Sequence, residues 1–442
     1  MEIPQELKDL SKRDLIRLLL SEREEFREAL YNFRKEVEEL KRKLLAYENA
    51  HTPPSQRGKY PKREYSDNPV GAPQGHEGTT RPIPKPNKFE TLEIKECPNC
   101  GKGLGGPIYI KKKIIEDIPE QQPLVITQFT VPHYFCNHCN AEVIPSHPDL
   151  PSEGRFGPNL QAQITLMKYE DRLPYRKIAK TLNRQYGLQL TPATVLDIIK
   201  RVSDKLQWIY EEIKKEIKNS MQVNADETGQ KVQGKQYWNW VFVTITSILF
   251  VIRKSRGQKV VMEVLGKDYK GITGCDGWKP YPSCVKIIQR CWAHLLRESK
   301  WYMEQCGNEA KFLYDALCKM FNRIKRITVE TPEKIRKETY DLCIKEMSMW
   351  IKRCKAYREL RKFSEKIENG LEHWFTCILH PEIEPTNNKA ERALRESVIQ
   401  RKISSLWNEK GVRIKETIMS VLATWNLRGL NSYSMLRQTL SS

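Results

Sequence analysis

The chain has 442 residues, with 75 Lys or Arg against 55 Asp or Glu, so its formal net charge is +20. Such an excess of positive charge attracts polyanions and favours nucleic acid or an anionic membrane surface as a partner. No apolar run reaches 18 residues and the N-terminus lacks the order of a secretory signal, so we expect no membrane span. We therefore expect a cytoplasmic protein of several domains, whose 12 cysteines are thiols or metal ligands rather than disulfides.

The N-terminal segment, residues 1–50, carries a heptad pattern that predicts a coiled coil. Its apolar residues alternate spacings of four and three, in a seam formed by Phe26, Leu30, Phe33, Val37, Leu40, Leu44 and Tyr47. Arg23 falls at one core position and weakens the seam there. The alternative is a single amphipathic helix that packs on its own chain, but we predict a homo-oligomer formed through this helix.

Residues 51–90 have the composition of a linker. Eight prolines lie between Pro53 and Pro86, among glycines and charges, and aliphatic residues are few. A segment of this composition cannot bury enough apolar surface to fold alone, so we expect a flexible, partly extended connection.

Residues 91–150 contain two Cys-x-x-Cys knuckles, which predict a zinc-ribbon domain. The knuckles are Cys97–Cys100 and Cys136–Cys139, with 35 residues and a strand-like run between them. Four thiolates can surround one Zn²⁺ as a tetrahedron, which leaves no position open to water. Free thiols or a redox pair are the alternatives, but paired knuckles with turn residues favour one structural zinc.

Residues 151–215 are predicted to be helical. A helix that starts near Pro174 is followed by Gly187 and then by Thr191 and Pro192, which suit the N-cap and first position of a second helix. Two helices joined near a glycine suggest a helix-turn-helix arrangement, whose second helix can enter the major groove of DNA. A helical subdomain that only packs is the alternative, because the pattern identifies no base-reading side chain.

Residues 216–410 mix strand-like and helical patterns, which predicts an α/β core. Asp226 lies in or just after the first strand of a meander, and Asp276 ends another short strand. Glu391 lies in a helix that Asn387 or Asn388 can cap. Acids on three separate elements suggest one site, although a turn-forming Asp or a solvated Glu is the ordinary interpretation of each alone.

These motifs together resemble the insertion-sequence 66 family of transposases, which belongs to the DDE class. The resemblance covers nearly the whole chain and rests on Asp226-Glu227-Thr228, Asp276 followed by Tyr281, residues 289–294, residues 387–392 and residues 401–404. It implies a multidomain α/β protein with a ribonuclease-H-like core, interrupted by a helical insertion at about residues 300–380. Residues 411–442 would be a helical tail.

The resemblance also implies that Asp226, Asp276 and Glu391 are the catalytic, metal-binding acids. Mg²⁺ prefers carboxylate oxygens, and two ions about 4 Å apart can stabilise both the attacking and the leaving oxygen of a phosphoryl transfer. The implied activity is Mg-dependent cleavage at transposon ends followed by strand transfer into target DNA, with accessory transposition proteins as further partners. His294 would position a phosphate or support the sheet. The candidate DNA-binding residues are Arg392, Arg395, Arg401 and Lys402.

Two other classes of protein fit the same sequence. One is a zinc-containing DNA-binding regulator whose acids are structural, and the other is a coiled-coil scaffold without catalytic activity. Metal-dependent strand transfer separates a transposase from both. Specific DNA binding without nuclease activity would indicate the regulator, and binding to protein alone would indicate the scaffold.

Overall fold

The computed structural model describes residues 11–47, 82–117, 124–151, 153–277, 281 and 284–441. These residues belong to two compact units, Met1–Gln122 and Pro123–Ser442, and each is described by itself. Most of the predicted linker at residues 51–90 lies outside the described residues, since the description resumes at residue 82.

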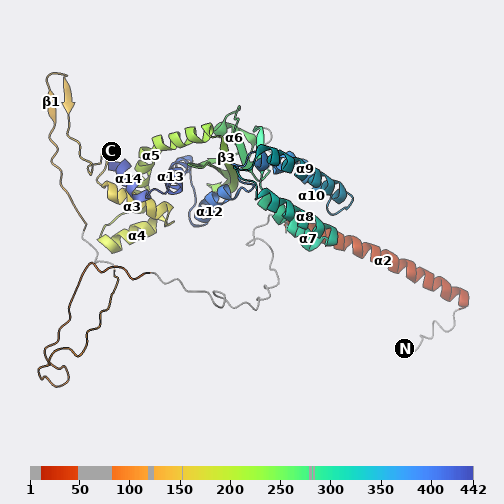
Figure 1. Ribbon diagram of the computed structural model, residues 1–442, viewed down its shortest axis with the longest axis horizontal. Helices are drawn as coiled ribbons and strands as arrows, with labels where there is room; N and C mark the ends of the chain where they lie inside the picture. The colour runs from red at the N-terminus through yellow and green to blue at the C-terminus, as the bar shows by residue number, and fades with distance from the viewer. Residues whose placement is uncertain are drawn as a thin grey trace. The chain divides into compact units, whose positions relative to one another are not determined.

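The first unit contains one long helix, α2 (Lys12–Tyr47), which confirms the predicted helical character of the N-terminal segment (Figure 1). Apolar side chains along it are exposed, among them Leu19, Phe26 and Phe33. A helix that offers such a stripe can bury it against a partner helix, but self-association of α2 stays a prediction.

The second unit is built on a mixed five-stranded sheet with the order β5-β4-β3-β6-β7. The meander β3-β4-β5 is antiparallel, whereas β6 and β7 run parallel to β3. The mixed α/β class and the strands expected within residues 216–410 are thereby confirmed. The strands are β3 (Gln222–Val232), β4 (Lys235–Val243), β5 (Ile248–Arg253), β6 (Ile272–Cys275) and β7 (Ile287–Arg290).

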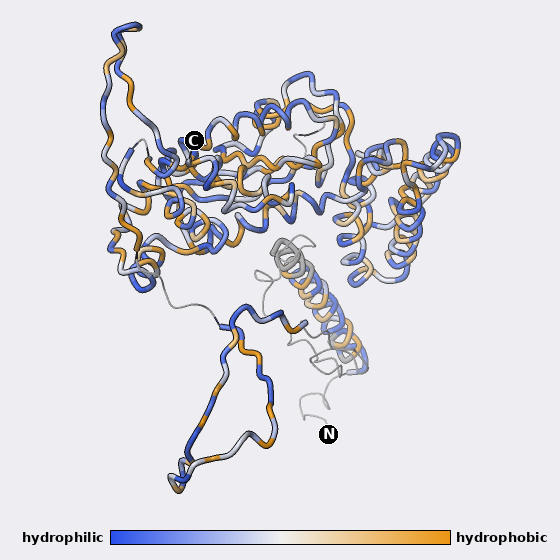
Figure 2. The backbone as a smooth tube through the Cα atoms, turned by 60° about the vertical axis from the view of Figure 1, so that its left-hand side comes forward, coloured by the Kyte–Doolittle hydropathy of each residue, from blue (hydrophilic) through white to orange (hydrophobic). Residues whose placement is uncertain are grey.

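Helices surround this sheet and form two apolar cores. The first core joins the sheet to α3–α6 and α12–α14, and the second lies within α7–α11 and reaches the sheet at β6 and β7. Figure 1 shows α7–α10 gathered to one side of the sheet, and Figure 2 shows polar and apolar residues alternating along the helices. The helices are α3 (Pro158–Tyr169), α4 (Tyr175–Tyr186), α5 (Pro192–Asn219), α6 (Gln258–Leu265), α7 (Trp292–Gln305), α8 (Gly307–Ile324), α9 (Glu333–Lys355), α10 (Arg361–Glu368), α11 (Thr376–Leu379), α12 (Asn388–Ile403), α13 (Glu409–Leu427) and α14 (Ser432–Ser441).

The junction between α4 and α5 has the local chemistry expected from the sequence. Gly187 ends α4 with a φ of +67°, a left-handed conformation that glycine adopts without steric cost. Thr191 then caps α5 by accepting a hydrogen bond from the backbone N–H of Thr194 at 3.1 Å, and Pro192 begins the helix. Whether this helix pair enters a DNA groove stays a prediction.

Helix α13 covers the edge strand β5 with a ladder of polar side chains. The backbone N–H groups of Ile248, Phe250 and Ile252 donate to side-chain oxygens of Thr424, Ser420 and Glu416 at 3.0, 2.8 and 2.5 Å. The spacings match, since two strand residues span about 6.8 Å and four helical residues about 6 Å. The exposed donors of an edge strand, which would otherwise pair with another chain, are therefore satisfied within the fold.

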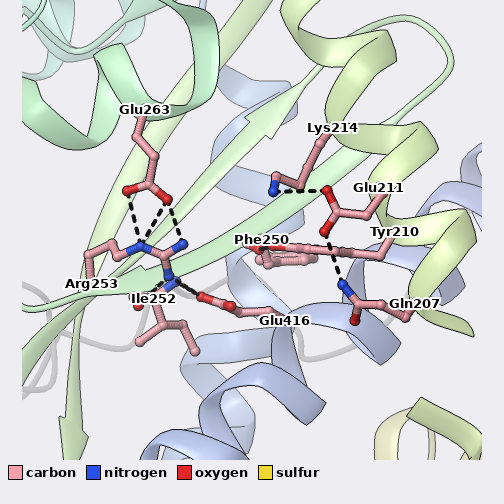
Figure 3. Close-up of polar contacts among 9 residues, drawn as sticks. All are labelled: Gln207, Tyr210, Glu211, Lys214, Phe250, Ile252, Arg253, Glu263 and Glu416. Atoms are coloured by element: carbon pink, nitrogen blue, oxygen red, sulfur yellow. Dashed lines mark hydrogen bonds and ion pairs between the residues drawn. The ribbon is translucent and has the colours of Figure 1, made fainter. Parts of the chain in front are cut away.

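A network of charges lies beside this ladder (Figure 3). Arg253 donates to Glu416 at 2.7 Å and to Glu263 of α6 at 2.6 Å. The hydroxyl of Tyr210 on α5 donates to the carbonyl oxygen of Phe250 at 3.3 Å. Helices α5, α6 and α13 are thus all fixed to the same edge of the sheet.

Candidate active site

The three predicted acids come from three elements of the second unit. Asp226 lies in the middle of β3, opposite Val241 of β4, Asp276 directly follows β6, and Glu391 lies in the first turn of α12. Asp226 is half-buried, and the burial around its carboxyl raises the pKa well above the ordinary value. The negative charges of Asp276, Glu227 and Glu391 raise this pKa further. The structure therefore brings the acids of the sequence prediction into one electrostatic environment.

Asn387 holds the start of α12 against the central strand. Its side-chain amide donates to the carbonyl oxygen of Ala225 at 2.8 Å, and its oxygen accepts from the amide of Asn224 at 3.0 Å. The neighbouring residue of β6 is Gly274, where a Cβ atom would clash with the amide of Asn224. This arrangement corrects one expectation, because the side chain of Asn387 bonds to β3 instead of capping its own helix.

The first turns of α7 and α12 meet at Cys291. The backbone N–H of Asn387 donates to the buried sulfur of Cys291 at 3.1 Å, and that of Trp292 donates to the carbonyl oxygen of Pro385 at 3.0 Å. Burial raises the pKa of the Cys291 thiol. Helix N-termini carry partial positive charge, so two of them at this point favour a nearby anion.

Cys291 and His294 also lie beside Glu391. The sequence did not predict that these three side chains form a cluster. The Nδ1 atom of His294 is 3.5 Å from Oε1 of Glu391, and one potential ligand atom from each of the three side chains lies within 4.8 Å of the others. The signal that could have revealed this cluster is the Cys-x-x-His spacing at a strand–helix junction, which places both side chains in the first turn.

The residues at this site fit a divalent cation. In the described part of the chain, Oε1 of Glu391 is buried and has no hydrogen-bond partner. The raised pKa of Asp226 means that its ionised form is costly until positive charge arrives. Carboxylate oxygens gathered in this way are the donors that Mg²⁺ prefers.

The other acid of the first motif has a different role. Glu227 is buried, and it accepts from Arg256 at 2.9 Å and from the hydroxyl of Tyr281 at 3.2 Å. Adjacent residues of a strand point to opposite faces, so Glu227 lies across the sheet from Asp226. Burial raises the pKa of Glu227, and Arg256 opposes that shift.

The candidate DNA-binding residues lie along α12 in two environments. Arg392, Arg395 and Lys402 are exposed, as a contact to phosphate requires. Arg401 is half-buried and donates to the hydroxyl of Thr228 at 2.8 Å and to the carbonyl oxygen of Gly229. Its guanidinium group is therefore partly occupied by β3.

The two cysteine knuckles belong to different units. The backbone N–H groups of Asn99 and Cys100 lower the pKa of Cys97, and those of Cys139 and His138 lower the pKa of Cys136. Such bonds favour the thiolate that zinc requires. Zinc itself stays a prediction.

The strand-like run between the knuckles does not form a strand. The described ribbon strands are β1 (Tyr134–Cys136) and β2 (Ala141–Val143), a short hairpin around the second knuckle. The strand-like run at residues 125–131 has no pairing strand among the described residues. Its β propensity alone is therefore not sufficient to form a strand.

A mixed sheet with an acid on its central strand and two more beside it is consistent with the core of a DDE transposase. Residues 153–413 match the Transposase IS66 family, and this is more than half of the chain. The chain belongs to that family. No protein of curated function matches it.

Membership gives the chain a transposase role and implies DNA and a divalent metal as its partners. The matched region contains all three acids and both helices that meet at Cys291. Among the described residues, none of the helices is apolar over a length sufficient to cross a membrane.

Proposed function

We propose that the chain cleaves phosphodiester bonds at transposon ends and joins the freed strands to target DNA, with Mg²⁺ as cofactor. Asp226, Asp276 and Glu391 are the catalytic acids in this proposal. The observation that carries it is the placement of the acids on adjoining elements: Asn387, one turn before Glu391, bonds to Ala225 beside Asp226, and Asp276 directly follows β6, which pairs with β3. Keeping such groups together is costly unless a cation offsets their repulsion.

The topology supports a ribonuclease-H-like core. The meander β3-β4-β5 continues into β6 and β7 on the other side of β3, so the first acid lies on the central strand. Helices α7–α11 occupy the chain between the second and third acids, where the helical insertion was expected. This insertion has its own apolar core, which reaches the sheet at β6 and β7.

Each acid would contribute oxygen ligands, with Asp226 and Asp276 from the sheet and Glu391 from the helix. Two bound Mg²⁺ ions would lower the pKa of the attacking group and offset the charge that develops at the phosphate. Cleavage and joining are both in-line displacements at phosphorus, so one arrangement of acids serves both steps.

The surrounding residues position the acids and the substrate. His294 lies 3.5 Å from Glu391 and restricts the orientation of that carboxylate. The N-termini of α7 and α12 favour the negatively charged phosphate, and the exposed Arg392 and Arg395 hold the backbone that flanks it. Lys402 and Arg401 extend this basic line toward the end of α12.

The remaining segments would assemble the complex on DNA. The helices α4 and α5 would contact the transposon end, a zinc ion would hold the two cysteine knuckles, and α2 would join copies of the chain. Accessory transposition proteins encoded beside the element are further partners in this proposal. The protein would act in the cytoplasm.

The direct test is a strand-transfer assay with DNA that carries the ends of the element and with Mg²⁺. We expect cleavage and joining by the wild-type protein and neither by Asp226→Ala. Specific binding of the ends without any cleavage, with the accessory proteins present, would instead indicate a DNA-binding regulator.

A further inference from the structure

Three cationic side chains converge where the C-terminal end of α12 lies between α3 and α13. They are Lys168 of α3, Arg401 of α12 and Lys415 of α13. Gln400 of α12 donates to the backbone oxygen of Tyr169 of α3, Ser397 of α12 contacts the sulfur of Met419 of α13, and the charges of Lys168 and Arg401 both act on Lys415. Lys415 is only 6% exposed and Lys168 only 9% exposed. Lysine is almost never buried to this extent without a partner, so the cluster needs an explanation.

The partners of these cations are all uncharged. Lys168 donates to the hydroxyl of Ser404 at 2.9 Å and lies 4.6 Å from the ring centre of Tyr175. Arg401 donates to Thr228 and Gly229 of β3. Among the residues that the structure describes, none forms a hydrogen bond or ion pair with Lys415, and no carboxylate pairs with the other two cations.

Burial lowers the pKa of Lys168 and of Lys415 from 10.5 to about 8. For Lys415, the positive charges of Lys168 and Arg401 lower the pKa further. Both lysines are nevertheless mainly protonated at neutral pH, so the fold holds like charges together without a counter-ion. An isolated buried charge is costly, and a bound anion would offset that cost.

The dipole of α12 stabilises only part of the positive charge in this cluster. The C-terminus of α12 carries partial negative charge, which favours Lys168 and Arg401 nearby. However, Lys415 donates to no carbonyl oxygen of the described residues, so the helix end does not satisfy its ammonium group. A ligand with several acceptor oxygens would supply bonds to this ammonium group.

The cluster lies close to the candidate active site. Arg401 bonds to Thr228, which is two residues beyond Asp226 on the same face of β3, a distance of about 7 Å along the strand. Along α12, Arg401 is ten residues from Glu391, or about 15 Å. Successive phosphates of one DNA strand are about 3.4 Å apart along the helix axis. A backbone phosphate bound here would therefore lie within a few nucleotides of the cleaved bond.

We propose that Lys168, Arg401 and Lys415 form a phosphate pocket that holds a backbone phosphate of the DNA near the cleaved bond. The identification of the ligand as DNA rests on the proposed function, whereas the affinity of the pocket for a phosphate group does not. Arg401 thereby acts as one member of a buried pocket rather than as an isolated surface contact.

The pocket can be tested first with inorganic phosphate on the full chain, by comparing thermal unfolding at constant ionic strength with and without phosphate. We expect phosphate to raise the Tm of the wild type, and Lys415→Met to lose at least half of that rise. The matched control is Lys345→Met, which removes an exposed lysine of α9 and should keep the full rise.

The sign of the change in stability separates a ligand site from a structural role. Without phosphate, Lys415→Met should unfold at the same Tm as the wild type or higher, because an apolar side chain replaces a buried charge. A lower Tm together with an undiminished response to phosphate would overturn the pocket and make Lys415 a structural residue.

The second test uses DNA that carries one neutral methylphosphonate at successive positions around the cleaved bond. In the wild type, one such position should weaken binding, and in Lys415→Met the same position should have no effect. Lys415→Met should also reduce the slope of log affinity against log salt by about one. Equal slopes and equal methylphosphonate profiles in the two proteins would refute the pocket.

The two proposals fail differently. A wild type that responds to phosphate through Lys415 but never cleaves DNA would overturn the proposed function and support the pocket. A wild type that cleaves and joins DNA while Lys415→Met responds to phosphate as the wild type does would overturn the pocket alone.

Discussion

The side-chain amide of Asn387 donates a hydrogen bond to the carbonyl oxygen of Ala225, 2.8 Å away. Ala225 immediately precedes Asp226, and Asn387 lies one helical turn before Glu391. The bond therefore joins the helix that carries one acid to the strand that carries another. Both residues of the pair are almost fully buried, so no water replaces the contact.

We predict that Asn387→Ala lowers the affinity for Mg²⁺ or Mn²⁺ because α12 is no longer held against β3. The change also leaves the amide of Asn224 without its acceptor, which costs about 1–3 kcal/mol of stability. Calorimetric titration and urea unfolding measure the two effects. Asn388→Ala, which alters the exposed neighbour, should change neither. Equal metal affinity in both variants would show that this bond does not position the acids.

The edge ladder predicts a loss of stability in Ser420→Ala. The N–H group of Phe250 would lose its acceptor in a buried position, at a cost of about 1–3 kcal/mol. Urea unfolding measures this, with Ser434→Ala of α14 as an exposed control. Unfolding curves that coincide for the two variants would mean that α13 covers β5 by apolar contact alone.

The buried lysines predict a rise in stability at alkaline pH. Their folded-state pKa is about 8 and their ordinary value is 10.5, so between these values the unfolded chain binds more protons. The free energy of unfolding therefore increases as pH rises through this window, and below pH 8 the full cost of the buried charge is present. Each unit of pKa difference is worth about 1.4 kcal/mol.

Lys415→Met should reduce this rise, because it removes one of the two groups that lose a proton early. Urea unfolding at several pH values between about 7 and 10.5 gives the two slopes. The difference between the two proteins reports Lys415 together with its effect on the neighbouring Lys168. If the stability of the variant rises with pH as steeply as that of the wild type, the ammonium group of Lys415 is exposed to water.

The cysteine knuckles predict about one Zn²⁺ per chain, held by Cys97, Cys100, Cys136 and Cys139. Cys97→Ser or Cys136→Ser should release the metal and unfold the region near residues 95–145 without unfolding the sheet. Elemental analysis and limited proteolysis measure these effects, with Cys318→Ser as the control outside the knuckles. Retention of zinc by the quadruple serine variant would exclude these ligands.

The sequence predicted the parts of the molecule that local patterns determine. Alternating apolar residues revealed the strands of the meander, and Thr191 with Pro192 revealed the start of α5. The three acids were assigned through the resemblance to the family, because each of them alone has an ordinary interpretation. The family comparison agrees with the resemblance that these motifs carried.

Contacts between residues that are far apart in the chain have no local sequence pattern from which they could be predicted. Asn387 bonds to residues more than 160 positions earlier, so its role appears only when α12 is placed on β3. Lys168 and Lys415 each look like an ordinary charge on an amphipathic helix, and only the folded structure shows that both are buried. Periodicity shows which face of a helix is buried, but not which side chains of other elements it meets.

The central claim is that Asp226, Asp276 and Glu391 act as one catalytic site. Substitution by the amide keeps the shape of each side chain and removes the charge that holds a cation. A suitable control is Glu396→Gln, which changes an acid of the same helix that pairs with Arg172 at 2.6 Å.

The most direct measurement is cleavage and strand transfer by Asp226→Asn, Asp276→Asn and Glu391→Gln with Mg²⁺, together with DNA binding by each. We predict that all three lose both reactions and still bind transposon ends, while Glu396→Gln keeps both reactions. Cleavage at the wild-type rate by any one of the three variants would contradict the assignment of that acid to the site.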